Sequence, residues 1–130
     1  MSEVVSVDPA GRLKVFKFLL KLGAATSDKG IDLRGYAPKA LLIEGTLTAT
    51  AFTFQGAIGN EKGNDTNQNY RVVQDGAGSA VTVTVASNQF VALSVAAQAS
   101  LLGIPFLKLV PGAAQSGQEI EVYLLASALP

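Results

Sequence analysis

The sequence RVVQDGAGSAVTVTVASNQFVAL, residues 71–93, decides the fold class. Val81, Val83 and Val85 alternate with threonine, so the valines share one face of an extended chain and the threonines share the other. This period of two predicts a β-strand with one buried side. Because one apolar face of a sheet must be covered, the pattern also predicts a second layer of structure.

Turn residues flank the valine strand on both sides. The run DGAG at 75–78 contains glycines that reach positive φ at low cost, so the valine strand is predicted to fold back on residues 71–73 as a hairpin. Asp75 is interpreted as a turn residue that accepts hydrogen bonds from the following backbone N–H groups. A second turn at 86–89 leads into a strand at 90–93. Residues 71–93 are therefore predicted to form a three-stranded meander.

Short apolar runs separated by turn residues continue along the chain. They are predicted to be strands at residues 31–33, 40–44, 51–55, 103–110 and 119–126. In the last of them, Ile120, Val122 and Leu124 share one face. Ser94 is predicted to cap a helical turn over 94–100. The fold class predicted from this spacing is all-β, a single-domain β-sandwich or jelly roll of about eight short antiparallel strands with an N-terminal arm.

The run from Leu13 to Leu22 fits two periodicities. As a helix, Lys14, Lys17 and Lys21 fall on one side with apolar residues opposite, whereas the alternation expected of a strand is imperfect. We favour a strand, because the run is rich in β-branched and aromatic residues and no helix-capping residue precedes it. The helical interpretation stays open at this point.

A length of 130 residues fits one domain. Residues 1–12 have little periodicity and are predicted to be an N-terminal arm without regular structure, and residues 13–130 are predicted to be the β-sandwich domain. Residues 56–69, GAIGNEKGNDTNQN, are predicted to be a long exposed loop.

The composition argues against several functional classes. The chain has no cysteine and no histidine, which removes disulfides, thiol chemistry, a Ser-His-Asp triad and the commonest metal ligand. Charged residues make up 15% of the chain and balance formally, so no overall field attracts nucleic acid or an anionic membrane. We expect a protein that is not an enzyme, uses no cofactor, has no nucleic-acid or membrane partner, and is made and used without export.

The sparse charges also predict an oligomer, because too few of them remain to cover the surface of a monomer. Basic residues concentrate in residues 1–39, where seven stand against four acidic ones. The lysines of residues 14–21 are interpreted as a solvated or partner-facing edge rather than a nucleic-acid groove. The oxygen-rich side chains of the 56–69 loop are a second candidate contact, although they lack the regular spacing of a calcium loop. The candidate interface residues are Arg12, Lys14, Lys17, Lys21, Asn64, Asp65 and Asn67.

A succession of turn and strand motifs runs from about residue 18 to residue 126. They are GAATS at 23–27, IDLRGY at 31–36, ALLI at 40–43, TAFTFQ at 50–55, DGAG at 75–78, VTVTV at 81–85 and FLKLV at 106–110. This succession resembles a family of small β-sandwich proteins encoded in the structural-gene clusters of tailed bacteriophages. The chain departs from that family in its 56–69 loop and its extended N-terminal arm.

The resemblance implies a virion protein, since many members of the family are capsid decoration or cement proteins that sit as trimers on the head. It therefore implies a homotrimer that binds the major capsid protein on the capsid surface, after synthesis in the cytoplasm of the bacterial host. A tail, fibre or baseplate module is an alternative. A carbohydrate-binding sandwich is another, but it would need exposed aromatic platforms, and the chain has no tryptophan and three tyrosines.

Overall fold

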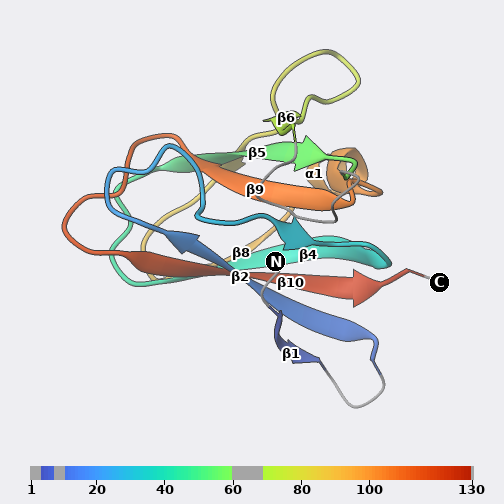
Figure 1. The fold of residues 1–130 in the computed structure, drawn as a ribbon, viewed down its shortest axis with the longest axis horizontal. Coiled ribbons are helices and arrows are strands. Elements are labelled where there is room, and N and C mark those ends of the chain that lie inside the picture. The colour runs from blue at the N-terminus through green and yellow to red at the C-terminus, as the bar shows by residue number, and fades with distance from the viewer. Residues whose placement is uncertain (1–3, 8–10, 60–68, 130) are drawn as a thin grey trace.

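Two antiparallel sheets pack face to face in the computed structural model, which describes residues 4–7, 11–59 and 69–129 (Figure 1). Sheet I has the strand order β1 (Val4–Val7), β2 (Leu13–Leu20), β10 (Ile120–Ala128), β4 (Tyr36–Glu44), β8 (Phe90–Ala92). Sheet II has the order β3 (Ile31–Asp32), β9 (Phe106–Pro111), β5 (Ala51–Ala57), β6 (Arg71–Val72), and β7 (Val83–Thr84) also pairs with β5. One short helix, α1 (Val95–Leu101), connects β8 to β9. The all-β sandwich is confirmed.

Alternating side chains from both sheets form the core between them. Phe16 and Phe18 of β2 in sheet I belong to the same core cluster as Phe52 and Phe54 of β5 in sheet II, and all four are fully buried. The inward residues of β10 are buried as well, as their spacing predicted; they are Ile120, Val122, Leu124 and Ala126. The sandwich is therefore closed by apolar residues at every second position of its long strands.

The run that fitted both a helix and a strand is a strand. Every residue of β2 from Leu13 to Leu20 is paired with β10. The strand assignment is confirmed, and this pairing satisfies the backbone groups of the run that point toward β10. Its inward side carries Phe16, Phe18 and Leu20, while Val15 and Lys17 point outward.

The valine stretch has the predicted faces but not the predicted partners. Val81, Val83 and Val85 are buried and the two threonines between them are exposed. The three-stranded meander is wrong, because β6 and β7 both pair with β5 in sheet II, whereas β8 pairs with β4 in sheet I. The two arms of the predicted hairpin meet only where Gln74 bridges Ala80 and nearby backbone groups bond.

The turn at 86–89 carries the chain from one sheet to the other. Asn88 adopts a φ of 55°, and its Oδ1 accepts a hydrogen bond from the Gly45 N–H at 2.8 Å. Ser87 Oγ accepts one from the Leu47 N–H at 2.8 Å. These bonds fasten the turn to the connection between β4 and β5, which explains why β8 joins sheet I rather than continuing beside β7.

Two local predictions about side-chain capping are confirmed. Asp75 Oδ1 accepts hydrogen bonds from the backbone N–H groups of Ala77 at 2.8 Å and Ser79 at 3.0 Å. Ser94 Oγ accepts one from the Ala97 N–H at 3.1 Å, at the start of α1. These three bonds satisfy backbone donors that would otherwise lack an intramolecular partner.

Part of the predicted arm is a strand. Residues 4–7 form β1, which pairs antiparallel with β2 and has a register shift between Val4 and Ser6. The interpretation of residues 1–12 as lacking regular structure is therefore wrong for this segment. The reason is that β2 would otherwise leave its backbone groups on that side without strand partners, and β1 satisfies part of them.

Gln115 joins the connections at one end of the sandwich and is only 2% exposed. Its Nε2 donates to the carbonyls of Thr46 at 2.8 Å and Gln118 at 3.0 Å. Its Oε1 accepts from the Thr48 N–H at 3.0 Å. One side chain thus links the β4–β5 connection to the β9–β10 connection.

We predict that Gln115→Ala lowers the free energy of unfolding by about 2–3 kcal/mol, because it leaves three backbone groups without their partner. Urea denaturation at neutral pH measures this change. The matched control is Gln118→Ala, at an exposed side chain in the same connection, which should stay within about 0.5 kcal/mol of wild type. Equal losses in the two variants would contradict the role assigned to Gln115.

Candidate functional site

The outer face of sheet I carries apolar side chains where a sandwich normally presents polar ones. Strand register places Leu125 opposite Val15, Tyr123 opposite Leu42, and Leu42 opposite Phe90. These positions alternate with the buried core positions, so they point away from the core. A sheet with one face on the core usually turns polar residues toward water on the other face, and these apolar residues depart from that pattern.

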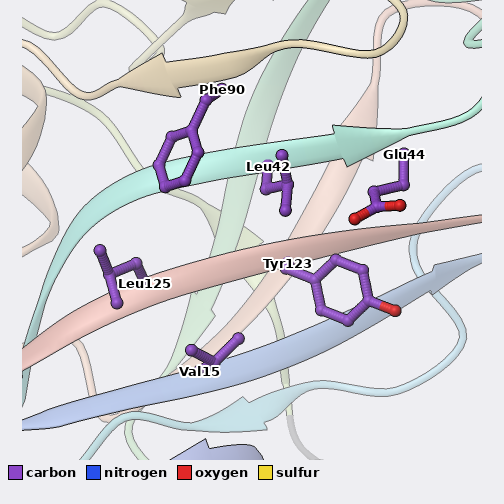
Figure 2. Close-up of a pocket in the computed structure, with 6 residues that line it drawn as sticks. All are labelled: Val15, Leu42, Glu44, Phe90, Tyr123 and Leu125. Atoms are coloured by element: carbon purple, nitrogen blue, oxygen red, sulfur yellow. The ribbon is translucent and has the colours of Figure 1, made fainter.

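These side chains enclose a depression of about 410 Å³, which we call the outer hollow. It is lined by Val15, Leu42, Glu44, Phe90, Tyr123 and Leu125. They come from β2, β10, β4 and β8, which are neighbours in sheet I. Figure 2 shows Phe90 reaching from β8 over β4 and Tyr123 projecting from β10. Phe90 is 63% exposed. The other apolar lining residues are partly buried, so this apolar surface is a candidate for contact with another molecule.

A small polar network borders the outer hollow. Lys17 Nζ lies 3.1 Å from Glu121 Oε2, and the Tyr123 hydroxyl donates to Glu121 Oε1 at 2.8 Å. The hydrogen bond from Tyr123 and the contact with Lys17 lower the pKa of Glu121. The same carboxylate raises the pKa of Tyr123, and the charge of Glu44 adds to that effect. Glu121 is therefore held as a carboxylate by its two neighbours.

Glu44 differs from Glu121, although the two lie directly opposite each other on β4 and β10. Among the residues that the structure describes, Glu44 forms no ion pair. Of the charged residues within 4–7, 11–59 and 69–129, it alone lines the outer hollow. The hollow therefore combines an apolar floor with an anionic edge, and an occupant with an apolar side chain and a nearby cation would suit it.

The basic residues predicted as an interface are not brought together. Lys14 lies over the Phe16 and Tyr36 rings, at 5.2 Å and 4.8 Å from their centroids, on the inward side of β2. Lys17 points to the outer face, and Lys21 pairs with Asp28 at 3.3 Å beyond the end of the strand. The structure thus distributes these cations over different sides.

The remaining predicted interface residues are placed as follows. Arg12 is exposed, and its carbonyl accepts a hydrogen bond from the Ala128 N–H at 2.7 Å. Asn64, Asp65 and Asn67 lie outside the described residues. A contact between any of the predicted residues and a partner stays a prediction.

The residues of the outer hollow were missed by the sequence analysis. A signal for them exists in the last strand, where the positions between Ile120, Val122 and Leu124 are not uniformly polar: Tyr123 and Leu125 occupy two of them. A strand that is apolar on both faces predicts that both faces are covered. The other lining residues come from distant segments, and only strand register brings them together.

Other features of the described residues do not form a chemical site. No group of three histidine, cysteine, aspartate or glutamate residues gathers there in a way that could hold a metal ion. A more polar depression of about 270 Å³ lies between residues 75–82 and α1, but the carboxylate of Asp75 at its rim already accepts two bonds from its own turn. In the same part of the chain, no helix combines the length and the hydropathy that a bilayer crossing requires.

Comparison with known proteins finds similarity to solved structures. No family model matches the sequence, and no curated protein matches it. A similar solved structure is the crystal structure of YomS, a protein derived from the SPBc2 prophage. The two chains share 10% sequence identity over 89% of this chain and 95% of that one, with a TM-score of 0.45. Similarity at this level assigns no function.

We predict that Glu121→Gln lowers the free energy of unfolding at pH 7 by up to about 1 kcal/mol, since the pair with Lys17 is partly exposed. A lowered folded-state pKa means that the stabilisation is present above the unfolded-state pKa of about 4.5 and is lost as the pH falls through the folded-state value. The difference between variant and wild type should therefore shrink in acid.

Urea unfolding measured from pH 7 down to about pH 3 tests this, because that range crosses the carboxylate titration. Glu119→Gln is the control, since Glu119 is exposed and forms no ion pair within the described residues. A difference between Glu121→Gln and wild type that stays constant with pH would contradict the assigned network.

Proposed function

We propose that this chain is a non-enzymatic structural protein of a phage virion, a capsid decoration or cement protein that binds the outer surface of the head and stabilises it by bridging capsomers. The observation that carries the proposal is the outer hollow, an apolar surface placed on the flat side of a two-sheet scaffold. The motif succession of the sequence supplies the phage assignment. The proposed partners are the major capsid protein and further copies of this chain, as a homotrimer.

Adhesion suits the outer hollow better than catalysis does. Glu44 and Glu121 project from neighbouring strands of one open face, whereas glycosidase chemistry needs two carboxyl groups on opposite sides of a bound sugar. Glu121 is already bonded to Lys17 and Tyr123. The remaining lining of the hollow is aliphatic or aromatic, which favours contact with a protein surface.

The scaffold has the properties that a cement protein needs. Its core joins two sheets through large, fully buried side chains, so an interface on its surface is held in a fixed shape. An oligomer presents the same contact several times, and multivalency then turns modest contacts into strong attachment to a lattice. The capsid surface is the proposed location, reached after synthesis in the bacterial cytoplasm.

The test uses heads of the phage that encodes the chain, prepared from a mutant that lacks the gene. We predict that the purified protein cosediments with these heads in a saturable manner, and that its addition raises the temperature at which they release DNA. Gold-labelled protein should decorate heads in electron micrographs. Labelling confined to tails would replace this proposal with the tail, fibre or baseplate alternative, and absence of binding to any part of the particle would overturn it.

A further inference from the structure

A second exposed apolar surface lies along α1. Val95 is the first residue of α1, Ala99 follows one turn later, and Leu102 is the C-cap residue directly after the helix, so helical spacing places the three on one side. Val95 is 83% exposed and Leu102 is 51% exposed. We call these three residues the helix ridge. The opposite side of α1 is buried through Ala97 and Leu101.

A cation lies beside the helix ridge. Lys39 Nζ donates to Gln98 Oε1 at 3.1 Å. Gln98 is three residues after Val95 and four before Leu102, so its side chain neighbours both on the helix surface. Among the described residues, Lys39 forms no ion pair. The ridge thus has an apolar crest with a cation at its side, and the outer hollow has an apolar floor with the anionic Glu44 at its edge.

The two surfaces face different directions on one molecule. The outer hollow lies on the side of sheet I that is turned away from the core, whereas α1 links β8 of sheet I to β9 of sheet II and stands at the side of the sandwich (Figure 1). A copy can therefore offer its hollow to one neighbour and its ridge to another.

We propose that the helix ridge of one copy packs into the outer hollow of the next, with Lys39 of the first copy facing Glu44 of the second. A helix that covers an exposed apolar sheet face is the ordinary packing of protein layers, here formed between copies. Because the two surfaces differ, the contact is heterologous, and in the proposed homotrimer it would close into a ring. Apolar burial supplies affinity, and the charge pair sets the register. This inference rests on the proposed function, because it takes the outer face of sheet I to be an assembly surface.

An isologous contact, in which the outer hollows of two copies pack against each other, explains fewer of the observed features than the ridge-into-hollow contact does. It would leave the helix ridge uncovered and give Lys39 no counter-ion. The ridge-into-hollow contact covers both exposed apolar surfaces and pairs both charges with one geometry. The self-association of the purified full-length chain, measured without phage particles, distinguishes the two arrangements.

The first experiment is a charge exchange followed by sedimentation velocity over a range of concentrations. We expect Glu44→Lys and Lys39→Glu each to weaken self-association about tenfold or more, and the double variant to recover it, because the exchanged charges again face each other. The matched controls are Glu119→Lys and Lys29→Glu, at exposed charges outside both surfaces, which should assemble as wild type does. Failure of the double variant to recover would overturn the pairing.

The second experiment mixes two variants that each lose one surface. Phe90→Glu damages the hollow and Val95→Glu damages the ridge, and both sites are exposed, so both variants should unfold in urea as wild type does. Each variant alone should be monomeric, while an equimolar mixture should form a dimer and nothing larger, since only one interface per pair is intact. Assembly of Val95→Glu to the wild-type size would overturn the proposal.

The readouts keep this inference separate from the proposed function. A wild-type chain that stays monomeric at high micromolar concentration, yet binds phage heads, would overturn the ridge-into-hollow contact and leave the head-binding role supported. Rings that assemble as described but bind no part of the particle would support the contact and overturn the head-binding role.

Discussion

The two-sided apolar character of β10 is the constraint on which the structure depends. Its inward residues close the core, and Tyr123 and Leu125 on the other side form the centre of the outer hollow. A strand that carries apolar residues on both faces is typical of a sheet that is covered on both sides. Sheet II covers one of them within the chain. Under the proposed function, the cover of the second face comes from another molecule, and this would tie the fold to assembly.

A few charged side chains lie at the edges of the apolar surfaces. Lys17, Tyr123 and Glu121 satisfy one another, which keeps a carboxylate beside an apolar surface at little cost. Glu44 and Lys39 remain as charges without an ion-pair partner among the described residues, each next to one of the two exposed apolar surfaces. In a chain with only 15% charged residues, such a placement would fix the orientation in which the two apolar surfaces meet.

Sequence reasoning predicted what is local and missed what depends on distant pairing. The alternation of Val81, Val83 and Val85, the turn of Asp75 and the cap of Ser94 are each determined within a few residues, and all are confirmed. Alternation shows on which face of a sheet a residue lies, but it does not show which strand pairs with the strand that carries it. For that reason the alternation within residues 71–93 predicts one meander, although the chain crosses between the two sheets there. The same limit explains why the sequence does not predict β1. The outer hollow needs the register of four strands at once, which no local pattern contains.

Hydroxyl-radical footprinting, read out by mass spectrometry, tests most directly whether the outer face of sheet I is the assembly surface. In dilute protein, Phe90 and Tyr123 should be oxidised readily, because both line an open hollow. In the assembled particle the account predicts strong protection of both, while Val72 on sheet II, an exposed apolar residue outside the hollow, keeps its reactivity. Equal oxidation of Phe90 in the dilute and assembled states would contradict the account.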